Sequence, residues 1–221
     1  MISEREENIL EMLIREYIRT AEPVSSERIA GRLKNKLSPA SIRHIFSELT
    51  DEGYIAQPHT SGGRVPKTPA YRFFVEYLLK KEISSVLPRS LAEAILDDIR
   101  PLQEELARHF HVLSVVLGRA PVGFEEIIRE PEFDEEKNVL RELARFVDDL
   151  DDCGAAYERI LEDAFAFLIG DENQIQPLEH MTLVITKTPD HENFFIAGPT
   201  RMQYDRIINF IKLWQTNRKT K

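Results

Sequence analysis

A short segment after residue 37 combines basic and small side chains in a pattern that suits contact with a negatively charged, flat ligand. It opens with Ser38 followed by proline, and its outward positions are Ala40, Ser41, Arg43, His44 and Ser47. The guanidinium of Arg43 can donate two parallel hydrogen bonds to a guanine edge, and small neighbours let the helix backbone come close. The segment therefore predicts a helix face that reads base pairs; an ordinary solvated helix face is the alternative.

A second segment, residues 54–66, places a basic side chain beside a glycine-rich tip. Two short extended runs flank Ser-Gly-Gly, which predicts a β-hairpin. Arg64 follows the tip and can enter a minor groove or bind phosphate. Further candidates for contact with a nucleic-acid backbone are His59, Thr60, Ser61, Gly62, Gly63, Lys67 and Arg72. For His59, packing within the hairpin is an equal alternative.

Three helical patterns precede the hairpin and must hold both segments. The first begins at Ser3, with Glu6 as the capping-box partner. A short second helix begins after Ser25 or Ser26. The third has Ser38 as its N-cap and proline at its first position. Its predicted buried stripe is Ile42, Ile45, Phe46 and Leu49.

The chain is predicted to be α+β and to contain two domains. Three helices, a hairpin and a closing helix at about 69–82 predict a winged helix-turn-helix domain over residues 1–82. Residues 83–90 form the expected linker, where Pro88 interrupts helical geometry. Residues 91–221 are expected to form a helical domain with a small sheet, suited to regulation and dimerisation.

A long apolar stripe opens the second domain and predicts a connecting helix, interrupted or kinked near Arg100 by Pro101. The stripe is either core or the seam of a helix that pairs with its copy in a dimer. Its members are Leu91, Ile95, Ile99, Leu102, Leu106, Phe110, Leu113 and Leu117. Helices are then predicted at 134–150, from Ala155 and from about Arg201, and strands at 165–169, 181–186 and 194–197.

Charge is divided unevenly along the chain, whose net value is −9. Residues 1–81 hold 13 Lys and Arg against 11 Asp and Glu, a net charge of +2, whereas residues 82–221 hold 16 against 27, a net charge of −11. Because phosphate binding depends on basic side chains, only the first part is expected to contact DNA. The single cysteine, the acidic start and the lack of a long apolar run favour a cytoplasmic protein without a disulfide or a membrane segment.

No motif in the sequence indicates an enzyme or a bound cofactor or metal. The acidic cluster at Asp148, Asp149, Asp151 and Asp152 is read as a solvated helix end. Asp171-Glu172-Asn173 can bind a cation in principle, but a loop turn is the preferred interpretation. The sequence therefore favours a binding function over a catalytic one.

Several motifs resemble the heat-inducible transcription repressor family, HrcA. The hairpin string Gln57-Pro58-His59-Thr60-Ser61-Gly62-Gly63-Arg64-Val65-Pro66 is the most specific. The others are Glu22-Pro23-Val24-Ser25-Ser26, Leu37-Ser38-Pro39-Ala40-Ser41-Ile42-Arg43, Gly53-Tyr54-Ile55, Tyr71-Arg72-Phe73-Phe74-Val75, Pro131-Glu132-Phe133, Leu168-Ile169-Gly170-Asp171-Glu172-Asn173 and Gly198-Pro199-Thr200-Arg201-Met202. His44 departs from the family pattern, which has asparagine there, so base preference is expected to differ at that position.

The resemblance implies a GAF-like C-terminal domain with an inserted dimerisation segment. Here Leu117 is followed almost directly by Glu130-Pro131, so the first strands of that sheet and the insertion are expected to be missing. This leaves a reduced GAF-like domain.

The resemblance also implies repression of chaperone operons through an inverted-repeat operator in double-stranded DNA, with a GroEL-type chaperonin as a further partner. A homodimer is expected because one recognition helix reads few base pairs. Two alternatives stay open: a ligand-sensing winged-helix regulator that uses the GAF-like domain, and a paralogue that no longer reads DNA.

Overall fold

The computed structural model is α+β and describes residues 2–34, 36–58, 62–81, 87–95, 98–135, 137–161 and 164–218. The chain divides into two compact units, Met1–Lys80 and Lys81–Lys221, called here the N-terminal and C-terminal units. Residues 59–61 of the predicted hairpin and residues 82–86, which include half of the predicted linker, lie outside the described residues.

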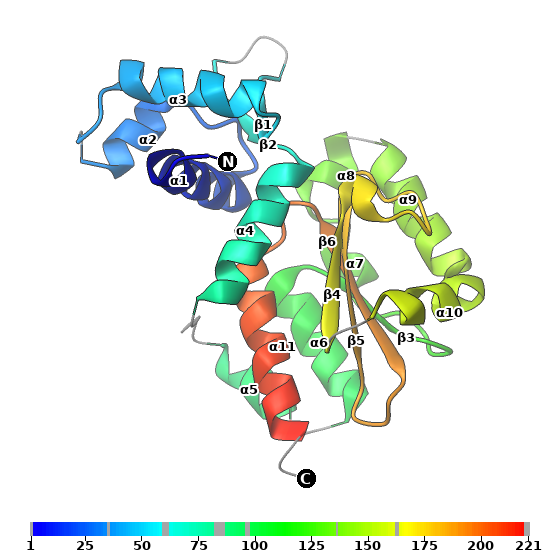
Figure 1. Cartoon of the computed structure of the whole chain (residues 1–221). Helices are drawn as coiled ribbons and strands as arrows, with labels where there is room; N and C mark the ends of the chain where they lie inside the picture. The colour runs from blue at the N-terminus through cyan, green and yellow to red at the C-terminus, as the bar shows by residue number, and fades with distance from the viewer. Residues whose placement is uncertain are drawn as a thin grey trace. The chain divides into compact units, whose positions relative to one another are not determined.

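The N-terminal unit consists of helices and one small sheet (Figure 1). Its elements are α1 (Glu4–Thr20), α2 (Ser26–Arg32), α3 (Pro39–Asp51), β1 (Ile55–Ala56), β2 (Val65–Pro66) and α4 (Thr68–Lys80). β1 pairs antiparallel with β2, so that Ile55 lies opposite Pro66. Val24, just before α2, forms a further antiparallel bridge with Arg64. The paired strands confirm the predicted hairpin.

Side-chain caps fix where the helices of the N-terminal unit begin. At α1, the backbone N–H of Ser3 donates to Glu6 Oε2 at 2.6 Å, which completes the predicted capping box. Ser25, not Ser26, caps α2, and Ser38 caps α3 by accepting from the backbone N–H of Ser41 at 3.1 Å. Local spacing therefore predicted these starts, and the structure decides between Ser25 and Ser26.

A buried carboxylate ties α1 to α2. The side chain of Glu16 is only 6% exposed, and its two oxygens lie 2.6 Å from Arg19 Nη2 and 2.7 Å from Arg32 Nη2. The hydrogen bond from Arg19 holds the pKa of Glu16 below its ordinary value, helped by the charges of Arg19 and Arg32 and opposed by burial. Glu16 thus stays ionised and joins the two helices.

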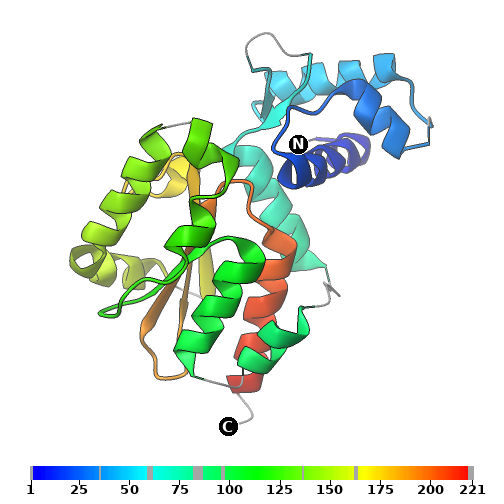
Figure 2. The ribbon, with the colours of Figure 1, turned by 180° about the vertical axis from the view of Figure 1, so that it is seen from behind.

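The C-terminal unit places helices on both faces of an antiparallel sheet, as Figures 1 and 2 show. The strands are β3 (Leu113–Val116), β4 (Phe165–Ile169), β5 (Met181–Lys187) and β6 (Asn193–Pro199), in the order β3-β6-β5-β4. The helices are α5 (Arg89–Ala94), α6 (Ile99–Phe110), α7 (Phe124–Ile127), α8 (Pro131–Glu135), α9 (Lys137–Asp148), α10 (Leu150–Ile160), the short 3₁₀ turn η1 (Gly170–Glu172) and α11 (Tyr204–Arg218). The three predicted strands are confirmed.

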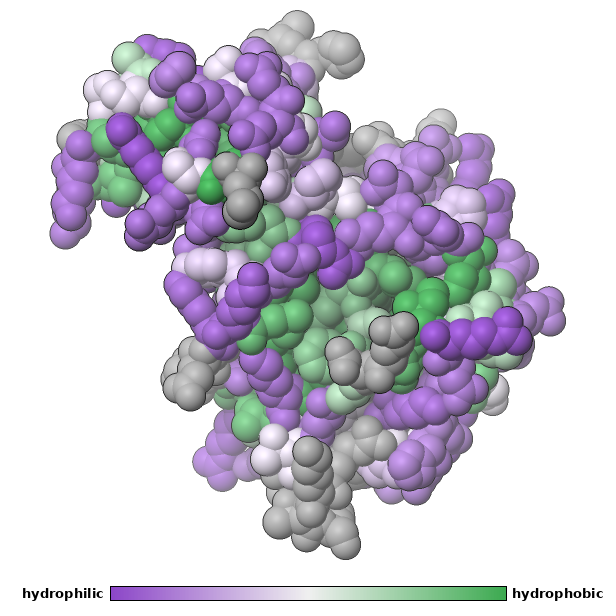
Figure 3. Space-filling model, in the orientation of Figure 1, coloured by the Kyte–Doolittle hydropathy of each residue, from purple (hydrophilic) through white to green (hydrophobic). Residues whose placement is uncertain are grey.

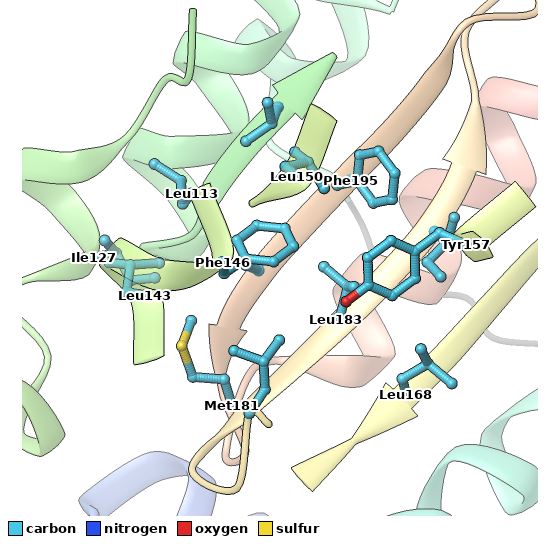
Figure 4. Close-up of a cluster of buried hydrophobic side chains, with 14 of the residues drawn as sticks. Leu113, Ile127, Leu143, Phe146, Leu150, Tyr157, Leu168, Met181, Leu183 and Phe195 are labelled. Carbon is cyan, nitrogen blue, oxygen red and sulfur yellow. The ribbon is translucent and has the colours of Figure 1, made fainter. Parts of the chain in front are cut away.

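Alternating side chains of the strands form two different layers. Leu183 of β5 and Phe195 of β6 pack against α9 and α10, where Tyr157 lies 5.5 Å from Phe195 between ring centroids (Figure 4). On the opposite face, Phe194 lies 5.2 Å from Trp214 of α11. The sheet is therefore the centre of an α/β/α arrangement, because both of its faces are apolar.

The predicted connecting helix is wrong beyond Phe110. The stripe divides into α5, α6 and strand β3, which contains Leu113 and pairs antiparallel with β6. Pro101 lies in the first turn of α6, where a missing N–H does no harm, so the helix starts beside it instead of kinking. All four residues of β3 are buried, and such a continuous apolar run can be mistaken for a helix.

Most of the stripe is buried within one chain, and Ile99 and Leu117 are half-buried. Its members Leu91, Leu102, Leu106, Phe110 and Leu113 are all buried. The core interpretation of the stripe is therefore confirmed, and the stripe gives no support for a dimer seam.

Candidate nucleic-acid interface

The outward face of α3 carries the predicted contact residues. Ile42, Ile45, Phe46 and Leu49 are buried, as predicted, and hold the helix to the rest of the unit. Opposite them, the side chains of Arg43 and His44 are 60% and 77% exposed. Ala40 and Ser47 are exposed and Ser41 is half-buried. The face is open and polar, with small side chains beside one arginine.

The start of α3 is held by two hydroxyls. Ser38 Oγ accepts from the backbone N–H of Ser41 at 3.1 Å, and the two hydroxyl oxygens lie 3.0 Å apart. The exposed Ser38 side chain is therefore engaged in capping. Its main effect is to place Arg43 one turn into a fixed helix.

Arg43 is oriented by a carboxylate of the neighbouring helix. Its Nη1 lies 2.9 Å from Glu27 Oε1 and donates a longer hydrogen bond, 3.4 Å, to Ser26 Oγ. Sequence reasoning missed Glu27. The available signal was its place in the first turn of a helix capped by Ser25, where an acidic side chain is favoured.

The described part of the hairpin is fastened to the segment before α2. The backbone N–H and C=O of Arg64 each bond with Val24 at 2.9 Å. Gly63 is buried, and a Cβ there would lie 2.7 Å from the carbonyl carbon of Pro23. Glycine is thus required at position 63 by the close approach of the Pro23 backbone, and not only by the predicted tight tip. Gly62, in contrast, is exposed and has open space around it.

The Arg64 side chain lies back along its own strand. It is half-buried, and Nη1 donates to the carbonyl oxygen of Gly63 at 3.2 Å. Its Nε is buried and has no hydrogen-bond partner among the described residues. Arg64 is therefore less open to a ligand than Arg43 is.

Of the remaining predicted contact residues, the structure describes two. Lys67 is exposed just after β2, and Arg72 is half-buried on α4. His59, Thr60 and Ser61 lie outside the described residues. The strongest described part of the interface is consequently α3 with its neighbour α2.

The C-terminal unit has a different surface. In the face seen in Figure 3, hydrophilic residues cover most of both units, and hydrophobic residues show over a broader area of the C-terminal unit than of the N-terminal unit. Among the described residues, no group of three His, Cys, Asp or Glu could hold a metal ion. Across the same ranges, no helix is both long and apolar enough to cross a membrane.

The two acidic segments noted in the sequence have structural explanations. Asp148, Asp149, Asp151 and Asp152 are exposed, as predicted. Glu172 accepts from the backbone N–H of Ile169 at 2.9 Å, and Asn173 Oδ1 accepts from the N–H groups of Ile175 and Gln176 at 3.2 Å. The segment 171–173 therefore forms a turn held by its own side chains.

Comparison with known proteins assigns the family. The family model described as "HrcA protein C terminal domain" matches residues 71–208, which is more than half of the chain. The chain belongs to the HrcA family. A heat-inducible transcription repressor HrcA from Carboxydothermus hydrogenoformans is 39% identical over 115 residues, which cover 52% of this chain and 34% of the relative. Another HrcA, from Desulforamulus reducens, is 47% identical over 81 residues, or 37% of this chain and 23% of the relative.

The match between this HrcA-family chain and its curated relatives is therefore partial: it spans about a third of the length of the first and a quarter of the second. A solved structure described as that of a hypothetical protein resembles the whole chain, with a TM-score of 0.75 and 18% identity. That likeness covers 100% of this chain and 98% of the other. At this identity it supports the fold alone.

Proposed function

We propose that this HrcA-family chain is a DNA-binding transcription repressor of heat-shock genes, not an enzyme. The observation that carries the proposal is the exposed face of α3, where Arg43 is 60% exposed beside small side chains. In this proposal the N-terminal unit is a winged helix-turn-helix domain. Helix α3 enters the major groove, and the hairpin of β1 and β2 is the wing.

In this proposal, Arg43 makes the central base contact and its neighbours make the surrounding contacts. Arg43 donates two N–H groups to a guanine, a contact worth about 1–3 kcal/mol of discrimination against other bases. Ala40 and Ser47 allow close approach, and His44 reads a neighbouring position. Lys67, Arg72 and the hairpin, including Arg64, neutralise phosphates, which makes affinity depend on salt.

We further propose that two copies bind an inverted-repeat operator as a homodimer. Their half-sites would lie a whole number of helical turns apart, at about 34–36 Å per turn. Because the apolar stripe is buried within one chain, this proposal depends on operator symmetry alone. The C-terminal unit would act as a reduced GAF-like regulatory domain in the cytoplasm, with a GroEL-type chaperonin as its partner.

The test is selection of bound fragments from a random duplex library with the full chain. We expect an inverted repeat to be enriched, with sites upstream of chaperone genes. Arg43→Ala should then lose about 10-fold or more of the preference for that sequence over a shuffled one. Arg89→Ala, which removes an exposed arginine of α5 paired with Glu93, is the matched control and should lose none.

Two outcomes would contradict the proposal. If the full chain enriches no duplex, the chain is not a sequence-specific repressor. If a duplex is enriched but Arg43→Ala behaves as Arg89→Ala does, α3 is not the reading helix. Light scattering with and without the selected duplex tests the homodimer separately. A mass that corresponds to one chain, both free and bound to the duplex, argues against it.

A further inference from the structure

Glu27 places a negative charge directly against the arginine to which the proposed function assigns base reading. It lies in the first turn of α2, and its Oε1 is 2.9 Å from Nη1 of Arg43 on α3. The two residues are 16 positions apart, so this contact joins two helices. An acidic side chain at a surface that must approach phosphates is unfavourable for affinity, and its presence needs an explanation.

Stability does not supply that explanation. The side chains of Glu27 and Arg43 are 63% and 60% exposed, and ion pairs this open to water contribute little to folding. The same helix is already tied to α1 by the buried Glu16, which binds Arg32 at 2.7 Å. The contact of Glu27 is thus better explained by its effect on Arg43 than by its effect on the fold.

The contact uses one corner of the guanidinium and leaves the rest open. Nη1 bonds to Glu27 and, at 3.4 Å, to Ser26 Oγ. Within the part of the chain that the structure describes, Nε and Nη2 of Arg43 have no hydrogen bond or ion pair. Since the guanidinium is planar, fixing Nη1 also fixes the plane of this remaining pair of donors, which is the kind of fork that meets two acceptors on a base.

The carboxylate is charged at the pH of a binding experiment. The backbone N–H of Glu27 is the largest influence that keeps the pKa of this carboxyl below its ordinary value, and the hydroxyls of Ser26 and Ser25 and the charge of Arg43 act in the same direction against the effect of burial. Glu27 is therefore ionised at neutral pH, and its backbone lies in the first turn of α2. A long arginine side chain that is oriented before binding loses less conformational entropy when the base contact forms.

We propose that Glu27 is a positioning residue that sets the base discrimination of Arg43 by fixing its guanidinium against α2. The inference rests on the proposed function and extends it. Glu27 lowers affinity for every duplex through its charge, and it raises selectivity because Arg43 can satisfy only an acceptor pair that lies in the fixed plane.

The experiment measures dissociation constants of the full chain for its selected duplex and for a shuffled duplex. The variants are Glu27→Ala, Glu27→Gln, Arg43→Ala and the double variant of Glu27→Ala with Arg43→Ala. Glu22→Gln is the matched control, because it removes one exposed carboxylate that pairs with a different arginine, Arg28. The thermal midpoint of each variant is recorded beside the binding data.

We expect Glu27→Ala to lower the ratio of specific to shuffled affinity about two- to fivefold, because an exposed ion pair can orient Arg43 by no more than its own interaction energy of about 0.2–1 kcal/mol. Affinity for the shuffled duplex should rise. Glu27→Gln keeps an oxygen that can accept from Nη1 and should fall between wild type and Glu27→Ala. In the Arg43→Ala background, loss of Glu27 should leave the ratio unchanged, and Glu22→Gln should leave it unchanged in the wild type.

Four results would overturn the inference. An unchanged ratio in Glu27→Ala, or an equal fall of the ratio in the Arg43→Ala background, would remove the positioning role while leaving the proposed function intact. If the ratio of specific to shuffled affinity falls in proportion to the thermal midpoint in all variants, Glu27 has a structural role only. If the wild-type chain prefers no duplex at all, the proposed function fails first and the inference fails with it.

Discussion

Arg43 and Arg201 are the same side chain in opposite settings. Arg43 lies on α3 with 60% of its side chain exposed and one equally exposed carboxylate as its ionic partner. Arg201 lies just before α11, is only 10% exposed, and binds both Glu130 and Glu132, with Nη2 3.0 Å from Glu132 Oε2. An arginine with two shielded partners holds segments of the fold together, whereas one with free donors is available to a ligand.

The two units differ in the same way as these two arginines. In the C-terminal unit, polar groups are used internally: the Tyr157 hydroxyl donates to Gln176 Oε1 at 2.8 Å and accepts from Asn173 Nδ2 at 3.0 Å. In the N-terminal unit, the charges on α3 face outward. Substitution of these internal groups should therefore change stability, whereas substitution of the outward charges on α3 should change DNA binding.

The largest effect is expected from Arg201→Ala. It leaves two shielded carboxylates together without their cation, and breaking such a cluster costs about 3 kcal/mol of unfolding free energy. Denaturant titration followed by Trp214 fluorescence measures it, because the single tryptophan lies in the C-terminal unit. Arg43→Ala should change the same quantity by less than about 0.5 kcal/mol. Equal losses of unfolding free energy in Arg201→Ala and Arg43→Ala would contradict the different roles assigned to the two arginines.

A smaller loss is expected from Tyr157→Phe. It leaves Asn173 and Gln176 without their buried partner, at about 1–2 kcal/mol. Burial raises the pKa of Tyr157 from 10.0 to about 12, while the hydrogen bond with Asn173 acts the other way. The folded state therefore favours the neutral phenol, so its contribution to stability is complete below pH 10 and is lost as the pH rises toward 12. Tyr157→Phe should lack this alkaline decrease; an identical pH profile would contradict the assignment.

Ser38→Ala tests how far local structure supports the exposed face of α3. Loss of the N-cap should lower the stability of the N-terminal unit by about 1 kcal/mol, which far-UV circular dichroism can follow. Ser38→Asn keeps a capping side chain and is the control. The Trp214 transition should not move in either variant, and a shift there would show that the units do not unfold independently.

The smallest effect on stability is expected from Arg64→Ala. Its side chain is half-buried but makes only one hydrogen bond, to the neighbouring carbonyl group, among the described contacts. If Arg64 neutralises a phosphate, the substitution should weaken operator binding and reduce the salt dependence by about one counterion. Arg64→Lys should keep the salt slope. If the salt dependence of binding is unchanged in Arg64→Ala, Arg64 does not contact phosphate, and α3 forms the contact surface without this part of the hairpin.

Sequence spacing was most informative where the interactions are local. The capping serines, the buried stripe of α3 and the strands β4, β5 and β6 were all predicted, because each depends on neighbours within a turn or on a run of β-forming residues. The strand β3 was missed because its apolar residues continue the spacing of α6. Only pairing with β6 distinguishes it, and that partner lies about 80 residues further along the chain.

The sequence by itself determined where helices begin, which faces are apolar, and that net positive charge is confined to the first 81 residues. Tertiary structure decided what those side chains contact. Glu27 meets Arg43 across 16 positions, Gly63 meets the backbone of Pro23, and Arg201 meets Glu130 across 71 positions. Contacts within one helical turn follow from chain geometry, whereas contacts between distant segments exist only once packing has fixed how the elements lie against each other.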